Sequence, residues 1–290
     1  DLQPYSRLQH SIGVALIIYH FTHDTVQSLA GLMHDISTPA FSHTIDFMNG
    51  DYLKQESTEE NTRICIENDA CISQYLSTNK ISIEDVCNYH IYPIADNPSP
   101  QLSADRLEYT LSNALNYHFA SKKEIAEIYT DITIGINEKC EEELLFMHSE
   151  QAECFAYLAL RCGKVYVSQQ DRFAMEALAR LTKTCLQKHV LDMDDLWKDE
   201  CFVIHKICQS EYKLAWEKYC SLSSVQKSDE GICIHAKKRY IDPYVLGKGR
   251  ICSIRDTIKH DVETFLEEDM HEKLIGECQD GKEYNCGCEW

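Results

Sequence analysis

The sequence contains few residues that interrupt regular structure, with only 11 Gly and 6 Pro among 290 residues. This scarcity favours helices, and we predict a mainly α fold. Long apolar runs are also lacking, because the longest one, residues 14–19, is far short of the roughly 20 residues that cross a bilayer. The composition, 44% apolar and 26% charged, is that of an ordinary globular protein, so no membrane partner is expected.

Positive charge is scarce as well, since 28 Lys and Arg face 47 Asp and Glu and give a net charge of −19. General nucleic-acid binding depends on clustered cations that neutralise phosphates, so this balance argues against it. A phosphorylated small molecule would have to be met by a local basic pocket.

Cysteine is abundant, with 15 residues, but the number is odd and a chain of this size needs no disulfide staples. We therefore expect reduced thiols and a cytoplasmic location. Cys278, Cys286 and Cys288 lie in a polar tail and make only a weak zinc site, because a fourth ligand is lacking. The chain starts at Asp1 without a signal-peptide pattern, and we expect some upstream sequence to be absent.

Helical spacing of apolar residues begins at residues 7–19 and resumes after Asp24. This second pattern ends at His34-Asp35, because Pro39 and the polar residues before it break the helix, and side chains at such an end can point into a cleft. Further helices are predicted at residues 59–77, 103–116, 121–129, 140–162, 171–189 and 254–275.

The period changes to two between residues 231 and 254, where Gly247 and Gly249 supply a turn. This pattern predicts a β-hairpin. We expect two domains: a core at residues 1–130, and a smaller helical C-terminal lobe at residues 131–290 that contains the hairpin and the polar tail.

Two further residues form a longer pattern with His34 and Asp35. They are His10 in RLQHSIGVALI and Asp105 in SADRLEYTLSNAL. The order His, His-Asp, Asp, with AGLMHDISTPAFSHTID around the central pair, resembles the HD-domain metal-dependent phosphohydrolases, and among them the deoxynucleoside triphosphate triphosphohydrolases. The resemblance is clearest over residues 7–46 and around Asp105. It implies a helical HD-domain core and a homo-oligomer.

The resemblance makes His10, His34, Asp35 and Asp105 the ligands of one divalent metal ion. Such a mixed nitrogen and oxygen set suits iron, manganese, nickel, zinc or magnesium, and the sequence does not choose among them. Taken alone, His10 is equally compatible with a hydrogen-bonded core histidine, and Asp105 with an acid at a helix N-terminus.

Arg7 lies three residues before His10, so on a helix both face the same way, and its guanidinium would grip a phosphate beside the metal. It matches a family arginine, although a surface salt bridge is the alternative. Tyr109 and Asn113 follow Asp105 at helical spacings, and Tyr109 matches a family tyrosine. Asn113 stands where the deoxynucleotide enzymes carry an acid, which weakens the inference of a sugar contact.

Lys237 and Arg239 share one face of the predicted hairpin in the segment KKRYIDPYV, which resembles a Lys/Arg-rich motif of related bacterial proteins. They are candidates for a phosphate clamp, and protection of a strand edge is the alternative.

The chain departs from the family where Thr38 and Thr58 replace two histidines. Threonine cannot shuttle protons near neutral pH. Asp46 matches a family acid and is our candidate base or orienting group, and His43 is the nearest titratable histidine, although it is also compatible with a helix cap.

We expect a metal-dependent phosphohydrolase that acts on a nucleotide or related phosphoester, and the resemblance implies deoxynucleoside triphosphates as the first substrate to expect. The alternative is a catalytically weak or inactive nucleotide sensor, in which the metal and phosphate sites persist without the proton-transfer groups.

Overall fold

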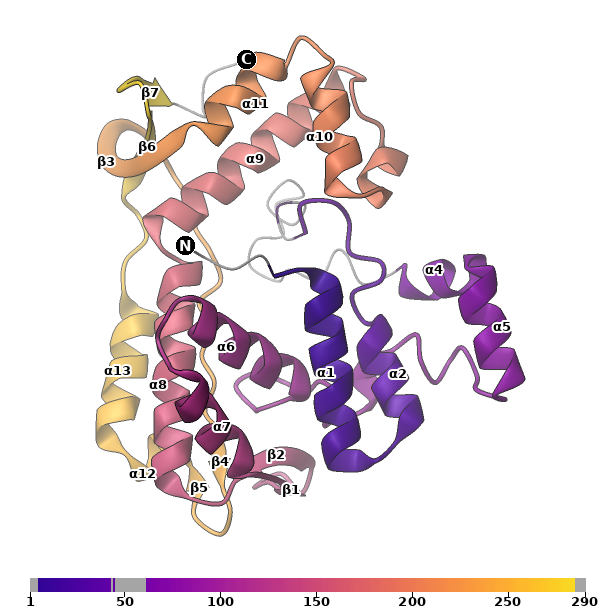
Figure 1. The fold of residues 1–290 in the computed structure, drawn as a ribbon. Coiled ribbons are helices and arrows are strands. Elements are labelled where there is room, and N and C mark those ends of the chain that lie inside the picture. Colours follow the sequence, from indigo (N-terminus) through magenta and orange to yellow (C-terminus); the bar gives the residue numbers. More distant parts are fainter. Residues whose placement is uncertain (1–4, 43, 45–60, 285–290) are drawn as a thin grey trace. The chain divides into compact units, whose positions relative to one another are not determined.

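The structure is a computed structural model that describes residues 5–42, 44 and 61–284, and it is mainly helical, as predicted (Figure 1). The helices within this part are α1 (Arg7–Thr22), α2 (Thr25–Met33), α4 (Thr62–Asn68), α5 (Ala70–Thr78), α6 (Ala104–Asn116), α7 (Lys122–Thr130), α8 (Ser149–Tyr166), α9 (Gln169–Gln187), α10 (Glu200–Cys208), α11 (Lys213–Cys220), α12 (Ile251–Ile254) and α13 (Asp256–Glu267), with 3-10 helices η1 (Tyr89–Ile91) and η2 (Met193–Trp197).

Two small sheets accompany the helices. The first has the strand order β1 (Ile132–Ile136), β2 (Glu142–Phe146), β4 (Tyr244–Val245) and β5 (Gly249–Arg250). The second has the order β3 (Leu222–Cys233), β6 (Lys273–Cys278) and β7 (Glu283–Tyr284). Neighbouring strands pair antiparallel, except that β2 and β4 run parallel with Phe146 opposite Val245.

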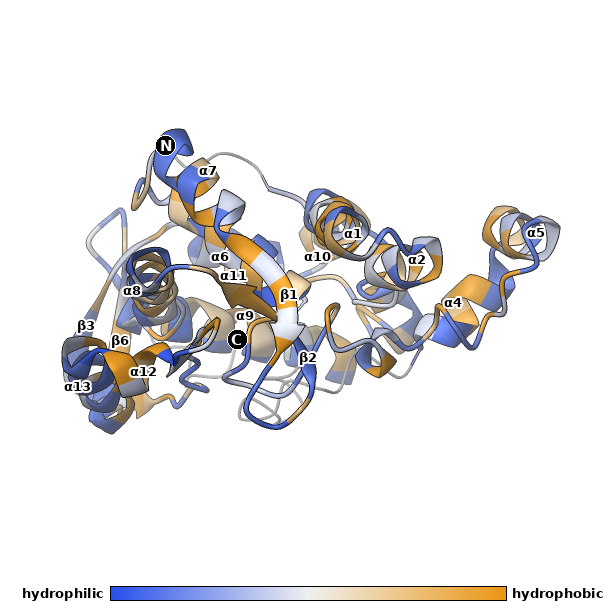
Figure 2. Ribbon diagram, turned by 90° about the horizontal axis from the view of Figure 1, so that it is seen from below, coloured by the Kyte–Doolittle hydropathy of each residue, from blue (hydrophilic) through white to orange (hydrophobic). Residues whose placement is uncertain are grey.

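The main helices begin where the sequence offers caps. Ser6 and Gln9 form a capping box at the start of α1. The Asp24 side chain accepts hydrogen bonds from the amides of Val26 and Gln27 at the start of α2. Ser103 caps α6 in the same way by accepting from Arg106 N. Figure 2 shows apolar and polar residues interleaved along helices such as α7 and α13, which is typical of helices with one buried face.

Four predicted elements differ from the observed ones. The helix predicted at residues 59–77 is divided into α4 and α5, because Asp69 between them leaves the helical conformation and caps α5. Residues 140–162 divide into strand β2 and helix α8, and residues 254–275 divide into α12, α13 and the start of β6. The short apolar run at residues 144–146 is compatible with either a strand or a buried helix. It forms a strand because it pairs with β1. The predicted hairpin at 231–254 is present only at its C-terminal end, where β4 and β5 pair around Gly247 and Gly249, both at positive φ. Residues 234–243 carry no strand.

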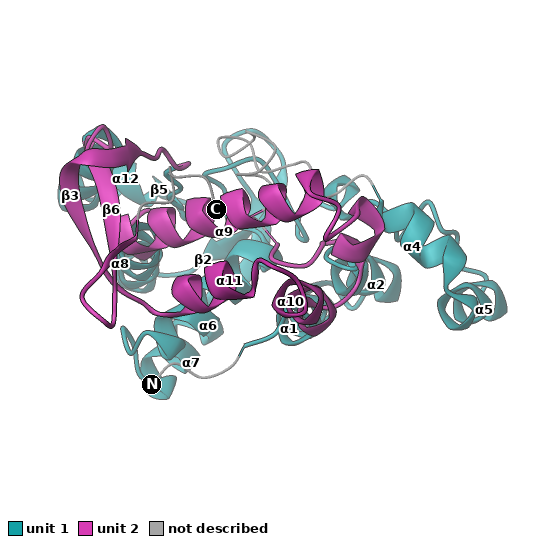
Figure 3. Cartoon of the chain, turned by 90° about the horizontal axis from the view of Figure 1, so that it is seen from above, with its two compact units in different colours: residues 1–36, 61–164, 238–267 teal, residues 37–60, 165–237, 268–290 magenta. Residues whose placement is uncertain are grey.

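The chain folds into two compact units, each built from separated segments (Figure 3). Unit 1 comprises residues 1–36, 61–164 and 238–267, and unit 2 comprises residues 37–60, 165–237 and 268–290. The domain boundary expected near residue 130 stays a prediction, because compactness alone does not establish which segments fold independently.

In unit 1, α1 packs closely on α2, and the two helices lie side by side in Figure 1. A Cβ at Gly31 would lie 2.4 Å from Ile18 Cδ1, so a larger residue there would force the Ile18 side chain to move. The other face of α2 packs through Met33 onto Ile66, Leu76 and Val86. The C-terminal end of α2 is thereby held from both sides, which fixes the position of His34.

A buried ion pair ties the first sheet to the loop before α6. The carboxylate of Glu143 is fully buried and accepts from Arg250 Nη1 at 2.6 Å and Nη2 at 2.8 Å. It also accepts from Leu102 N and Asn137 Nδ2, each at 2.9 Å. All of its hydrogen-bonding capacity is therefore used within the protein.

Unit 2 is organised around α9, which contacts β3 and β6. Its core is formed by apolar residues from α9 to α11 and the segments between them, together with Ala40. The buried members are Ala40, Leu181, Cys185, Leu191, Leu196, Val203, Ile207, Tyr212 and Ala215. Across the described residues of both units, no helix has the length and apolar character required to span a membrane.

Candidate metal centre

Three of the predicted ligands converge from three helices of unit 1. His10 lies in α1, His34 is the C-cap residue of α2, and Asp105 lies in the first turn of α6. One ligand atom from each lies within 4.8 Å of the others. His10 Nε2 is 3.0 Å from Asp105 Oδ1, and His34 Nε2 is 3.8 Å from the same oxygen. Two imidazole nitrogens and a carboxylate oxygen form the donor set of a transition-metal site.

Both imidazoles are oriented through their second nitrogen. His34 Nδ1 donates to the Gly31 carbonyl oxygen at 2.7 Å, which leaves Nε2 as the acceptor facing the cluster. His10 Nδ1 lies 2.5 Å from Glu108 Oε2, while its Nε2 faces Asp105. Metal-bound histidines characteristically donate their other ring N–H to a carbonyl or carboxylate, and this arrangement fits a metal ion.

Glu108 is a site residue that the sequence reasoning missed. Its Oε1 accepts from Ser112 Oγ at 2.7 Å and from the Tyr5 hydroxyl, while Oε2 contacts His10. A Cβ at Gly13 would lie 2.7 Å from the Glu108 carboxylate, so glycine in α1 makes room for it. Its spacing of three residues from Asp105 on one helix was the signal that could have found it.

The charges of the cluster reinforce one another. Burial lowers the pKa of His10, but hydrogen bonds to Asp105 and Glu108 outweigh it and raise the pKa to about 10. Burial raises the pKa of Asp105, but the hydrogen bond from His10 and the charges of His34 and Arg106 outweigh it and hold the pKa at about 2. The centre is therefore built to stabilise positive charge, which a bound cation would supply.

Asp35, the fourth predicted ligand, lies next to the group of His10, His34 and Asp105 but does not belong to it. Its Oδ2 lies 3.6 Å from His34 Nε2, and its side chain is 29% exposed. It stands at the edge of the three-residue group formed by His10, His34 and Asp105.

The candidate substrate-binding residues lie in different places. Arg7 is half-buried in α1, one turn before His10, and Tyr109 and Asn113 are half-buried in α6 after Asp105. Burial raises the pKa of Tyr109 to about 12, even though the charge of Arg239 opposes this rise. Arg239 therefore lies within electrostatic reach of Tyr109. Lys237 belongs to unit 2 and Arg239 to unit 1.

The proton-transfer candidates mostly fall outside the described residues. These are His43, Asp46 and Thr58, the last at a position where the resemblance led us to expect a histidine. Thr38 is described, is half-buried and belongs to unit 2.

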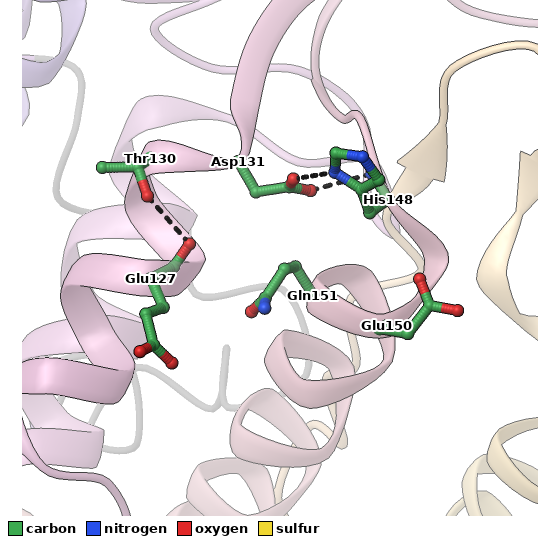
Figure 4. A pocket seen from close by; sticks show the side chains of 6 residues that line it. All are labelled: Glu127, Thr130, Asp131, His148, Glu150 and Gln151. Carbon is green, nitrogen blue, oxygen red and sulfur yellow. Dashed lines mark hydrogen bonds and ion pairs between the residues drawn. The ribbon is translucent and has the colours of Figure 1, made fainter.

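A pocket elsewhere in unit 1 contains none of the predicted site residues (Figure 4). It is lined by Glu127, Thr130, Asp131, His148, Glu150 and Gln151. Asp131 accepts from His148 N at 2.9 Å and also contacts His148 Nδ1, and Figure 4 shows the two side chains facing each other. Because His148 directly precedes α8, these contacts fix the start of that helix and are explained by structure alone.

Two curated proteins are similar to the chain. An uncharacterised protein of Bacillus subtilis, YdhJ, is 26% identical over 247 residues, which cover 83% of this chain and 74% of that protein. The metal-dependent phosphohydrolase cns2 of Cordyceps militaris is 29% identical over 119 residues, which cover 39% of this chain and 32% of that protein. No family model matches the chain.

Proposed function

We propose that this chain is a metal-dependent phosphohydrolase of the HD-domain superfamily. The observation that carries the proposal is the convergence of His10, His34 and Asp105, with both imidazoles oriented by hydrogen bonds from their second nitrogens. The name of the Cordyceps relative supports the same chemistry. Asp35, adjacent to His34, completes the proposed ligand set.

One divalent ion, iron, manganese, nickel, zinc or magnesium, would polarise a phosphoryl oxygen and lower the pKa of a bound water. The chain would supply the remaining functions. Arg7 would grip a phosphate oxygen pair, since a guanidinium binds such groups in bidentate fashion. Tyr109, Asn113, Lys237 and Arg239 are the other proposed substrate contacts. Glu108 would hold His10 in the orientation that presents Nε2.

Proton transfer is assigned to Asp46, with His43 as a second candidate. Because Thr38 and Thr58 stand in place of family histidines, a leaving group would be poorly protonated, and a general acid or base typically contributes about 10²–10⁴-fold. We therefore expect slow turnover of deoxynucleoside triphosphates, and relatively better cleavage of an activated aryl phosphoester, whose leaving group needs no proton.

The second candidate function is a nucleotide sensor that binds metal and phosphate without efficient turnover. The replacement of family histidines by Thr38 and Thr58 favours it. The sensor and the enzyme share the metal centre and differ only in turnover.

A metal-supplemented hydrolysis screen over nucleotides and aryl phosphoesters, with identification of products, tests the proposal. We expect activity in wild type, loss of both bound metal and activity in His34→Ala, and reduced activity with metal retained in Asp46→Asn. His260→Ala, on α13, is the matched histidine control. A folded wild-type protein that binds no metal after supplementation would contradict both functions. Metal and nucleotide binding without turnover of any substrate would favour the sensor.

A further inference from the structure

A second group of metal-ligating side chains lies in unit 2, separate in sequence from the centre described above. Cys233 ends strand β3, His235 follows it after one residue, and His271 precedes strand β6. One ligand atom from each lies within 4.8 Å of the others. Cys233 Sγ is 3.4 Å from His235 Nε2, and the rings of His235 and His271 are 5.2 Å apart in an edge-to-face arrangement.

We propose that Cys233, His235 and His271 form a second metal site, suited to zinc, with water in the fourth position. Zinc bound by one thiolate and two imidazoles has Zn–S near 2.3 Å and Zn–N near 2.0–2.1 Å, so tetrahedral geometry places S and N about 3.5 Å apart. The observed separation of 3.4 Å between Cys233 Sγ and His235 Nε2 agrees with this value. A thiolate ligand favours zinc over magnesium or calcium, which prefer oxygen.

The backbone of both segments is fixed independently of any ion. Arg172 in α9 is only 2% exposed, and its guanidinium donates to the Ile234 carbonyl oxygen, between Cys233 and His235. The same guanidinium forms an ion pair of 2.6 Å with Glu272, the residue next to His271. One buried cation therefore clamps the two segments that carry the three ligands, which is the support that a preorganised metal site needs.

Local strand geometry contributes to the same placement. The pairing of β3 with β6 shifts register between Lys227 and Ile232, and a Cβ at Gly231 would lie 2.3 Å from the Leu274 carbonyl oxygen. Glycine thus lets β3 approach β6 at the irregularity, after which Cys233 pairs with Lys273. This register places the thiol beside Met270, whose carbonyl oxygen is 3.6 Å from Cys233 Sγ.

The turn before β6 adds negative charge to the site. Asp269 Oδ1 accepts from His271 N at 2.9 Å and lies 3.6 Å from His271 Nε2. A carboxylate at this distance places negative charge beside the imidazole, which favours a bound cation. Zinc here would fasten the turn before β6 to the end of β3.

Cobalt titration of the reduced, metal-free protein tests the proposal, because a thiolate–cobalt charge-transfer band reports sulfur ligation. The first centre has only nitrogen and oxygen ligands and cannot produce this band. We expect the band in wild type, saturating at one equivalent bound at this site, and its loss when zinc displaces cobalt. Cys233→Ser should abolish it and lower the total bound cobalt by one equivalent.

Matched controls separate this site from other thiols. Cys201→Ser removes an exposed cysteine of α10 and should leave the band unchanged. A Cys286→Ser, Cys288→Ser double variant should also retain it, and loss of the band in that variant alone would overturn the proposal. His271→Gln, which keeps the thiol, should require at least about tenfold more cobalt for the same signal.

Two results would refute the site directly. One is cobalt uptake by the reduced wild type with no thiolate band, which would reduce the cluster to a thiol–imidazole hydrogen bond. The other is a band that survives Cys233→Ser. If Cys233→Ser does not fold by circular dichroism, the His235→Gln and His271→Gln variants decide, and unchanged titrations in both would overturn the proposal.

Discussion

Replacing Glu108 by glutamine tests whether the carboxylate behind His10 supports metal binding. The side chain of Glu108 is 8% exposed and lies 2.5 Å from His10 Nδ1. The substitution keeps the shape but removes the charge, and a charge-assisted hydrogen bond is roughly twice as strong as a neutral one. Outer-shell substitutions of this kind typically lower metal affinity by about 10–100-fold, which is about 1.4–2.7 kcal/mol.

The affinity is measured by competition with a chelator of known strength, at fixed pH and with one metal. Glu263→Gln, on α13 with a 56% exposed side chain, is the matched control and should leave the affinity unchanged. Tyr5→Phe removes one of the donors to Glu108 and should give a smaller loss than Glu108→Gln. Wild-type affinity in Glu108→Gln, with the fold intact by circular dichroism, would refute the assignment of Glu108 as the support of His10.

Three further predictions concern other residues. Arg7→Ala should weaken phosphate-ligand binding by about 1.5–3 kcal/mol without loss of metal, and unchanged affinity for every phosphate ligand tested by calorimetry would return Arg7 to a surface role. Glu143→Ala should lower the free energy of unfolding by about 3–5 kcal/mol, because it removes the carboxylate that pairs with Arg250 and accepts from the buried Leu102 N and Asn137 Nδ2. Denaturant unfolding would measure this, and a loss below about 1 kcal/mol would contradict it. Burial raises the pKa of the Cys185 thiol to about 11, so alkylation at pH 8 should modify exposed Cys201 and spare Cys185. Peptide mass spectrometry would measure the labelling, and equal labelling of the two cysteines would show that the core around Cys185 opens.

Much of the candidate metal centre was predictable because its residues follow local patterns. The break after His34 placed that residue at a helix end, and Ser103 as N-cap placed Asp105 in a first turn. Both features depend on neighbours in sequence, which propensity and capping govern. Glu108 was missed because its role depends on how closely α1 approaches α6, and only the space beside Gly13 reveals that approach.

The strands were the least predictable part of the fold. Residues 144–146 have an apolar pattern that is compatible with a helix, and β2 exists because β1 and β4 pair with it. In the same way, β6 depends on β3, which lies about 50 residues earlier in the chain. Strand formation is settled by partners that are distant in sequence, whereas a helix satisfies its hydrogen bonds within its own segment.

The sequence by itself determined the helical character of the chain and the helix positions of His10, His34 and Asp105, because caps, breakers and spacing act over a few residues. Only the tertiary structure decided that these ligand atoms lie within 4.8 Å, and that Glu108 stands behind His10. It also brought Cys233, His235 and His271 together, from segments that the sequence separates by more than 30 residues. The physical reason is that a site assembled across elements depends on their packing, and packing is set by long-range contacts such as the Arg172 clamp.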